Sequence, residues 1–439
     1  MRLLAITAAL AAVAVGQWSE PVTLAESVAT SGSGPEFVPM QGDTAWVFWI
    51  HQDVWPEGRL MARCLTGDTW GEPELLSVGP NGISWPAGVV DDSGRVLVAY
   101  YEGSYPTKSP ADQDSQGIYT MTRTDTVWSP PALAQGPLAQ VFPAFVRLGK
   151  ARDGSVGMIW DERSGGYNGR DSVMVSRKTD GGWTPRCCLA PGRYPDVYCH
   201  SGSLVPGDST DFLVVFSRWT DPDTSEIEVW GMNDSLVQAP AVFRGALPML
   251  ARGQTTRFLV LTRGDTLLGA ENHGAGWSDP LLIAYGLGSS GAALCADPLG
   301  WGWVCWPSIT HQSVLASYNS GVGWSRPETV ATSSYLGSPR IASDGLGNPH
   351  CVWLDYSGGS VELRHARRLA RPGVEEGRFK PQAAHITPTI VRCVPAGSFV
   401  FDAMGRRVTN PKPGVYFLGQ GLGTRGQALR RMRKVVIQR

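Results

Sequence analysis

The sequence is low in charge and histidine, and it lacks several motifs of enzyme chemistry. Charged residues make up 18% of the chain, and no two of its seven His stand at metal-binding spacing. The eight Cys include no C-x-x-C pair, so the common zinc arrangements are excluded. A phosphate-binding Gly-rich loop and a Ser-His-Asp signature are also missing. We therefore expect no metal and no cofactor.

Long apolar runs and amphipathic helical periods are absent after the first 16 residues. Those 16, MRLLAITAALAAVAVG, combine the charged Arg2, an apolar run of thirteen residues and a small-residue cleavage site. Thirteen apolar residues are too few to span a bilayer. We interpret residues 1–16 as a signal peptide and expect a secreted or outer-surface protein without a transmembrane segment in the mature chain.

The net charge of −1 hides two regions of opposite sign. Residues 361–439 contain 16 Lys and Arg against 4 Asp and Glu, whereas residues 1–360 contain 22 against 35. The larger region is therefore acidic, and nucleic acid binding needs a basic face. We expect no nucleic acid partner.

What the sequence does contain is one hairpin pattern that returns about every fifty residues. Residues 171–190, DSVMVSRKTDGGWTPRCCLA, predict a strand, a tight Asp-Gly-Gly turn and a second strand opened by Trp. Other copies surround Trp70, Trp128, Trp277 and Trp324, with a degraded copy at Pro240 and a half-copy at Trp18. From Trp18 to Trp324 the mean period is 51 residues, which is typical of propeller blades.

Seven further strand pairs lie between these hairpins, each an apolar strand followed by a second apolar strand. The last blade lacks its outermost strand, because no Trp strand follows residues 361–369. The half-copy at Trp18 can supply that strand and close the ring without an unpaired edge. The predicted fold is all-β. It is a seven-bladed β-propeller over residues 17–370, with four strands per blade and the N-terminal strand closing the last blade.

The C-terminal region predicts a second domain. Pro, Gly and charged residues make 371–389 a linker, and residues 390–439 predict a small β-sandwich. FDAMGRRV, PGVYFL and the closing RKVVIQR resemble the C-terminal sorting domain of the type IX secretion system of Gram-negative bacteria. That resemblance implies export across the outer membrane, with the outer-membrane secretion machinery as a partner.

The hairpin turns carry a second resemblance. KTDGGW at 178–183, with Asp180 and Trp183, is similar to the Asp-box of bacterial neuraminidase repeats, as are NHGAGW and NSGVGW before Trp277 and Trp324. The resemblance implies a structural role for the box. Sialidases of this kind have six blades and an arginine on the first inner strand, whereas SGPEFVPM here has none. No catalytic residue is therefore assigned from the resemblance.

The predicted ligand face lies over blades two to four. Four antiparallel strands place the loop after the second strand and the link to the next blade on one face. The residues before the strand-opening Pro are aromatic in these three blades, namely Trp85, Phe142 and Tyr194. Aromatic rings suit stacking on sugars or apolar side chains, although they can also plug the central funnel. The loops 102–117, 161–171 and 217–226 are long, as functional loops often are.

Charged candidates occupy the same sector: Glu102, Asp161, Glu162, Arg163, Asp196 and Arg218. Glu102 and Asp161 suit acid/base glycoside chemistry if their carboxyl groups are roughly 5 to 9 Å apart. Against this, Asp161 follows Trp160 much as Asp355 follows Trp353-Leu354, which favours a turn residue. The two arginines suit an acidic ligand or simply neutralise nearby acids.

These features favour a secreted or surface-displayed propeller that binds a glycan or protein ligand without turnover. The alternative is a glycoside hydrolase of the neuraminidase-like superfamily with a divergent site, and a third possibility is a structural or adhesive module. Cys295 and Cys305 are able to form a disulfide if the strand register places them opposite each other. DPDTSE at 221–226 is interpreted as a solvated acidic turn rather than a calcium loop.

Overall fold

The computed structural model describes residues 18–29, 34–52, 57–80, 82–103, 116–124, 126–136, 138, 141–164, 170–191, 198–207, 211–221, 224–233, 241–288, 291–368, 389–391, 398–401, 408, 414–420 and 432–437. The predicted signal peptide and nearly all of the predicted linker lie outside these ranges. The chain divides into two compact units, Met1–Arg371 and Pro372–Arg439. Within the described ranges the regular secondary structure consists of strands, and no helix there is long and apolar enough to cross a membrane.

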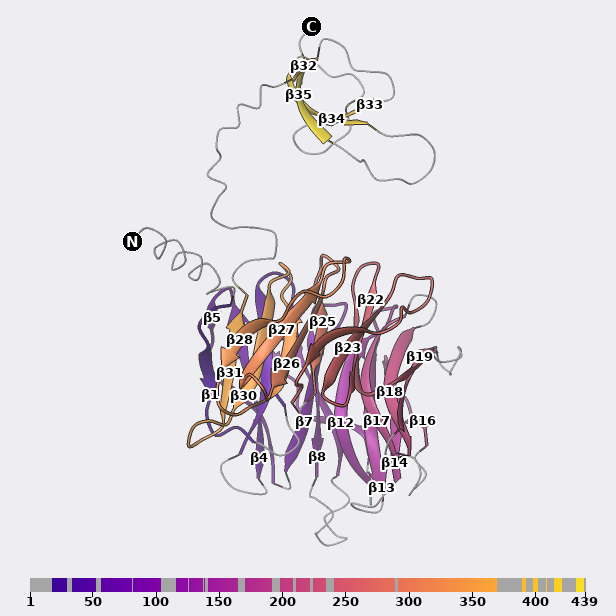
Figure 1. The fold of residues 1–439 in the computed structure, drawn as a ribbon. Helices are drawn as coiled ribbons and strands as arrows, with labels where there is room; N and C mark the ends of the chain where they lie inside the picture. The colour runs from indigo at the N-terminus through magenta and orange to yellow at the C-terminus, as the bar shows by residue number, and fades with distance from the viewer. Residues whose placement is uncertain are drawn as a thin grey trace, which may run out of the picture. The chain divides into compact units, whose positions relative to one another are not determined.

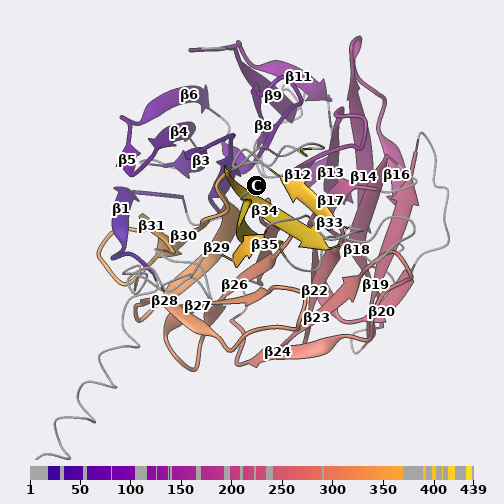
Figure 2. The ribbon, with the colours of Figure 1, turned by 90° about the horizontal axis from the view of Figure 1, so that it is seen from above.

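The first unit is a β-propeller of seven blades, as the sequence predicts (Figures 1 and 2). Blade one contains β2 (Glu36–Pro39), β3 (Thr44–His51), β4 (Gly58–Thr66), β5 (Thr69–Trp70) and β6 (Glu74–Gly79). Blade two contains β7 (Ile83–Val90), β8 (Val96–Glu102), β9 (Gly117–Thr124), β10 (Val127–Trp128) and β11 (Ala132–Gln135). Blade three contains β12 (Val141–Lys150), β13 (Val156–Ser164), β14 (Arg170–Thr179), β15 (Gly182–Trp183) and β16 (Cys187–Ala190).

The remaining blades have four strands each. Blade four contains β17 (Tyr198–Pro206), β18 (Phe212–Asp221), β19 (Thr224–Met232) and β20 (Ala241–Arg244). Blade five contains β21 (Ala246–Arg252), β22 (Arg257–Arg263), β23 (Thr266–Asn272) and β24 (Leu281–Tyr285). Blade six contains β25 (Ala293–Ala296), β26 (Gly302–Ser308), β27 (Ser313–Asn319) and β28 (Glu328–Thr332). Blade seven contains β29 (Leu336–Ser343), β30 (Pro349–Asp355), β31 (Glu362–Arg367) and β1 (Val22–Ala25).

The N-terminal strand closes the ring, and this prediction is confirmed. β1 pairs antiparallel with β31, with Val22 opposite His365, and an isolated bridge joins Trp18 to Arg368. The Trp18 side chain is buried and its Nε1 donates to Glu328 Oε2 over 3.3 Å. The ring is therefore held shut by a strand ladder and by a buried tryptophan that packs against blade six.

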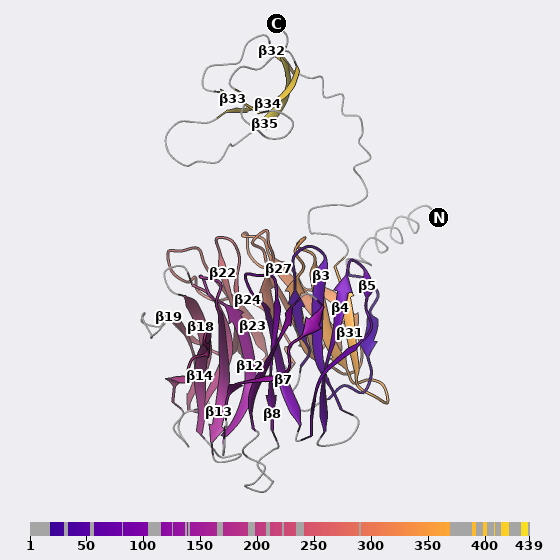
Figure 3. The same ribbon diagram turned by 180° about the vertical axis from the view of Figure 1, so that it is seen from behind.

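The second strand of each blade is apolar because neighbouring blades cover both of its faces. All seven residues of β26 are buried, and Figure 3 shows the sheets of blades two and three side by side. The hairpin tryptophans fill the gaps between blades. Trp128, Trp277 and Trp324 lie edge-on against Phe48, Phe243 and Phe258 of the preceding blade, at centroid distances of 5.8, 6.0 and 6.1 Å. The repeated Trp is therefore a residue of the fold.

Asparagine caps the tryptophan turns of blades five and six. Asn272 and Asn319 stand five residues before their Trp, and each side-chain oxygen accepts a 2.8 Å hydrogen bond from the glycine N–H two residues on. Asn319 also donates to Glu271 Oε1 of blade five over 2.5 Å. In blade three Asp180 is exposed, and Thr179 Oγ1 instead donates to the Gly182 carbonyl over 3.0 Å. Turn capping thus differs between blades.

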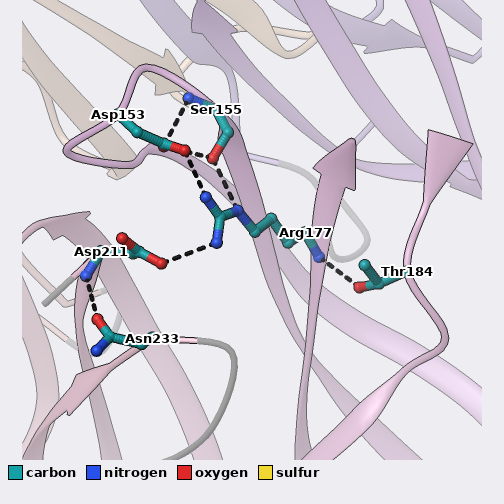
Figure 4. Close-up of polar contacts among 6 residues, drawn as sticks. All are labelled: Asp153, Ser155, Arg177, Thr184, Asp211 and Asn233. Atoms are coloured by element: carbon teal, nitrogen blue, oxygen red, sulfur yellow. Dashed lines mark hydrogen bonds and ion pairs between the residues drawn. The ribbon is translucent and has the colours of Figure 1, made fainter. Parts of the chain in front are cut away.

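An arginine joins blades three and four. Arg177 on β14 donates through Nη1 to Asp211 Oδ2 of blade four over 2.8 Å, and through Nη2 to Asp153 Oδ2 of its own blade over 2.5 Å (Figure 4). Its Nε donates to Ser155 Oγ over 2.9 Å, and Asp211 N–H donates in turn to Asn233 Oδ1. Because Arg177 has several partners at fixed positions, it holds the two blades in register.

The buried cysteines lie between blades six and seven. Cys305 and Cys351 are both fully buried in one apolar cluster, and Cys295 packs against it. In the β25–β26 ladder Cys295 lies opposite Trp303, and Cys305 lies opposite Ala293. The register therefore does not place Cys295 and Cys305 opposite each other, and all three are free thiols.

The second unit contains one four-stranded sheet in the order β32, β35, β34, β33. Its strands are β32 (Thr389–Val391), β33 (Ser398–Phe401), β34 (Gly414–Gln420) and β35 (Met432–Ile437). β32 and β35 pair in parallel, whereas the other two pairs are antiparallel. The last three strands lie where FDAMGRRV begins, at PGVYFL and at RKVVIQR.

Candidate functional site

The antiparallel order of each blade sorts its loops onto two faces. We call the face with the loops between second and third strands, and with the links between blades, the 2–3 face. In described residues it includes 308–313, 333–337 and 355–362. The opposite face, with the first turn and the tryptophan turn of each blade, is the 1–2 face. The 2–3 face is the lower edge of the disc in Figure 1.

The innermost strands carry a bulge just inside the 2–3 face. In four blades one bulge residue has a left-handed backbone, with φ between 48° and 57°, namely Trp85, Phe145, Leu247 and Ser338. The registers of β7 and β12 both shift across these residues, between Ser84 and Ala87 and between Ala144 and Arg147. Phe145, rather than the predicted Phe142, therefore occupies the blade-three position that corresponds to Trp85.

The two aromatic residues pack on each other. Their ring centroids are 4.4 Å apart with an angle of 43° between the planes, and Trp85 also packs against the apolar cluster of blades two and three. The Trp85 Nε1 atom is buried without a hydrogen-bond partner among the described residues. Trp85 is thus placed on the predicted face, half-buried between two blades.

Glu102 and Arg218, two of the predicted charged residues, each interact with groups of their own blade. Glu102 ends β8 on the side of Tyr100 and Tyr119, and burial raises the pKa of its carboxyl group. Arg218 on β18 forms an ion pair with the buried Glu228 of its own blade, with 3.2 Å from Nε to Oε1, although the angle is not that of a hydrogen bond. Each is thus close to groups of its own blade.

Asp161 lies within β13 rather than in a turn. It is 3% exposed and is paired with Ala144 on one side and Val173 on the other. Ile159 of blade three and Val352 of blade seven hold the same position in their ladders. Asp355 stands three residues after Val352, so its counterpart in blade three is Glu162, three residues after Ile159. The comparison of Asp161 with Asp355 was therefore shifted by one residue.

Four other predicted residues are only partly described or not described. Phe142 on β12 lies opposite Arg163 on β13 in the strand register. Tyr194 and Asp196 lie outside the described residues, as do residues 104–115 and 165–169 of the long loops.

One repeat position brings charge to the central axis. This position lies on the innermost strand, and in blade order its residues are Glu36, Ala87, Arg147, Ser203, Met249, Ala293 and Arg340. They are equivalent because each pairs with the corresponding residue of the second strand, which is in the same order Phe48, Ala99, Ile159, Val215, Val260, Cys305 and Val352. In four blades the residue at this position is uncharged, so the propeller fold does not need a charge there. The charged residues of blades one, three and seven are therefore candidates for a functional role.

These three side chains interact near the 2–3 face. Arg340 Nε lies 3.7 Å from Glu36 Oε2, and both side chains are 19% exposed. Burial raises the pKa of Glu36, whereas Arg147, Arg340 and a hydrogen bond from the Gly88 backbone act to lower it. Burial and the charge of Arg340 lower the pKa of Arg147 to about 10, although Glu36 and Asp161 oppose the shift. Two guanidinium groups and a partly exposed carboxyl group therefore share the axis.

A cavity opens on the same face between blades six and seven. Its volume is about 440 Å³, and it is lined by parts of the loop 308–313 and the link 333–337, with Gly288, Pro307 and Tyr356. Sequence reasoning missed this cavity because its loops are short. It also missed the axial charges, which become visible in the sequence only when the inner strands are aligned across their bulges.

The 1–2 face has a hollow of about 650 Å³ between blades two and three. Its charged groups pair with one another, since Arg95 Nη2 lies 2.8 Å from Asp91 Oδ2 and Arg177 is paired with Asp153. In the described part of the chain no three His, Cys, Asp or Glu side chains are arranged to hold a metal ion.

The sequence matches no protein family and no curated protein. Its fold is similar to that of solved structures. An ulvan lyase of polysaccharide lyase family PL25 aligns with a TM-score of 0.51 at 9% identity, over 78% of this chain and 95% of that chain. Trypanosoma rangeli sialidase aligns with a TM-score of 0.44 at 9% identity, over 80% of this chain and 60% of that chain. The likeness is one of propeller fold.

Proposed function

We propose that this chain is an exported propeller that binds an acidic glycan on its 2–3 face without cleaving it. The observation that carries the proposal is the axial repeat position, where Glu36, Arg147 and Arg340 replace the uncharged residues of four other blades. Guanidinium groups bind carboxylates and sulfates through paired hydrogen bonds. Two guanidinium groups share this position with one carboxyl group, that of Glu36, so an acidic ligand adds counter-charge for the arginines.

The fold likeness agrees with a glycan ligand. The ulvan lyase structure of similar fold has been solved with -[GlcA(1-4)Rha3S]- bound, a glycan with carboxylate and sulfate groups. For the chain studied here the glycan class is a proposal drawn from the axial arginines.

A glycan array of neutral, uronate-bearing and sulfated oligosaccharides tests the proposal on the full chain. We expect binding to acidic glycans, and about a tenfold loss of affinity on Arg147→Met or Arg340→Met. Arg95→Met on the 1–2 face is the matched control and leaves the affinity unchanged. Equal binding of neutral and acidic glycans, or variants that bind like the parent, would contradict the proposal.

Glu36 keeps glycoside cleavage as a second candidate. A carboxyl group with a raised pKa beside two arginines is suited to general acid or base catalysis. Incubation of the bound glycans with the chain, followed by a reducing-end assay, separates the two functions. New ends that appear with the parent and not with Glu36→Gln favour the enzyme, whereas an unchanged glycan favours binding alone.

Export is part of the proposal, and it is supported by the signal-like residues 1–16 and by the three C-terminal motifs. The outer-membrane secretion machinery is the proposed partner of residues 390–439. Fusion of residues 372–439 to a periplasmic reporter in a bacterium with a type IX system tests this step. Reporter at the cell surface or in the medium supports sorting, and reporter retained in the periplasm contradicts it.

A further inference from the structure

The cavity between blades six and seven has the size and position of a ligand pocket. Its volume of about 440 Å³ falls within the roughly 300 to 1,000 Å³ of small-molecule sites. All of its walls come from the 2–3 face, namely the loop after β26, the link from β28 to β29, the link before β25 and the loop after β30.

The walls offer an aromatic ring and hydroxyl groups without charge. Tyr335 is 66% exposed, and its ring lies 5.1 Å from that of Tyr356 with an angle of 65° between the planes, so most of the Tyr335 ring is open to solvent. Several serines and Gln312 line the cavity, and no charged residue is among the described residues that line it. A partly apolar ring face with many hydroxyl groups is the chemistry of an uncharged sugar.

One hydroxyl group is left without a partner. Ser313 lines the cavity, is 2% exposed, and its Oγ has no hydrogen-bond partner in the described part of the chain. A buried hydroxyl group in this state is unfavourable, because the hydrogen bonds that it made with water are lost. Gln312, beside it, has a left-handed backbone with φ of 46°, which non-glycine residues rarely adopt. Backbone strain and a buried hydroxyl group without a partner in the described residues thus lie together at the wall of the cavity.

We propose that this pocket binds a neutral pyranose unit, with the sugar ring stacked on Tyr335 and its hydroxyl groups bonded to the serines. The inference rests on the proposed function, since the neutral unit belongs to the same glycan as the acidic group at the axis. It adds a second subsite, of different chemistry, to the 2–3 face.

The chain connects the pocket directly to the axial charges. Gly337 lines the pocket, and Arg340 follows three residues later on β29. Ser338, between them, lies beside the Tyr356 phenol. A Cβ added to Gly34 would lie 3.1 Å from Ser338 Cβ and 3.2 Å from Arg340 Nη2, so the residue before the Pro of blade one is close to both. A glycan with adjacent neutral and acidic units therefore suits both subsites.

The test compares Tyr335→Ala with Tyr285→Ala in the full chain. Both tyrosines are exposed, at 66% and 67%, and Tyr285 ends the outermost strand of blade five. Affinities are measured by titration calorimetry with array-selected oligosaccharides that contain both unit types, and with acidic oligosaccharides that lack the neutral unit. Melting temperatures show that both variants are folded.

We expect Tyr335→Ala to weaken binding of the mixed oligosaccharide about tenfold, with no change for the acidic one and none on Tyr285→Ala. Equal affinities of the parent and Tyr335→Ala for the mixed oligosaccharide overturn the pocket, even when Arg147→Met still weakens binding and the proposed function stands. Loss of binding on Tyr335→Ala without loss on Arg147→Met supports the pocket and overturns the axial acid site. A parent that binds no glycan overturns both.

Discussion

Blades two to four and blades six and seven present different surfaces on the same 2–3 face. In the first sector the Trp85 ring packs on Phe145, and Arg218 pairs with the buried Glu228. In the second sector Tyr335 is exposed and lines a cavity of about 440 Å³. The described contacts of the first sector thus belong to packing within the propeller, whereas the second sector presents an exposed aromatic ring beside a cavity.

The comparison separates two kinds of evidence for a binding surface, namely residue type with loop length in one sector and an open cavity in the other. The sequence signals in blades two to four were aromatic residues and long loops, and these are what internal packing also uses. The pocket between blades six and seven arises where short loops fail to fill a gap. Four predictions test the contrast, in order of decreasing effect.

Arg218→Ala should lower the free energy of unfolding by about 2 to 3 kcal/mol, because it removes the positive charge beside the buried Glu228 carboxylate and leaves Trp230 Nε1 as its hydrogen-bond donor among the described residues. Urea unfolding measures the change. Arg95→Ala, which breaks an exposed pair, should cost less than about 1 kcal/mol. Equal losses of stability in the two variants would show that the Arg218–Glu228 pair contributes no more to folding than an exposed ion pair.

Trp85→Ala should cost about 2 kcal/mol of stability while glycan affinity is unchanged, because the half-buried ring packs on Phe145. Tyr335→Ala should do the reverse, with a stability change within about 0.5 kcal/mol. Denaturant unfolding and calorimetric titration of both variants give the two readouts. A loss of glycan affinity on Trp85→Ala would instead indicate that the binding site lies over blades two to four, as the sequence predicts.

Asn319→Ala in blade six should cost about 1 to 2 kcal/mol, since the side chain is fully buried and bonded to Gly321 and Glu271. Asp180→Ala at the corresponding turn of blade three should change stability by less than about 0.5 kcal/mol, because Asp180 is exposed. Thermal unfolding compares them. A larger loss for Asp180→Ala would restore the aspartate as the residue that caps the turn.

Acid should weaken blade seven. His365 is buried beside His350, with 3.0 Å between His365 Nε2 and His350 Nδ1, and His350 Nε2 lies 3.4 Å from Asp344 Oδ2. Burial, His350 and Arg367 lower the pKa of His365 well below 6.5, so the folded chain holds it neutral. The unfolded chain binds this proton more readily, and stability is therefore lost as pH falls from above 6.5 towards the lowered pKa.

Unfolding free energies between pH 8 and 5 measure this dependence, with His365→Gln as the comparison variant. Phe37 stacks on both rings and Trp70 lies edge-on to His365, so the remaining neighbours do not titrate. The slope between the two pKa values should be shallower in the variant. Equal slopes would place the acid sensitivity elsewhere, since Asp344, whose pKa is lowered, contributes in the same direction at lower pH.

The blade plan was predictable because the hairpin tryptophan recurs at the same position in most blades. The hairpin tryptophans and the half-copy at Trp18 fixed the number of blades and the closure. The site was less predictable because backbone bulges shift the alignment between blades. The sequence therefore predicted Phe142 at the position that Phe145 occupies, and it matched Asp355 with Asp161 although the equivalent residue is Glu162. The pocket depends on the gap between two packed sheets, which no local pattern encodes.

The closure of the ring also sets how the propeller responds to tension. Trp18 and Arg368 are bridged at the same end of the β1–β31 ladder. A force that draws the two ends of the ring apart therefore acts on the Trp18–Arg368 bridge first and on the next bonds only after it has broken. The hydrogen bonds between β1 and β31 would therefore break one after another. Blade seven would open at low force, while the sheets of the other blades would stay intact.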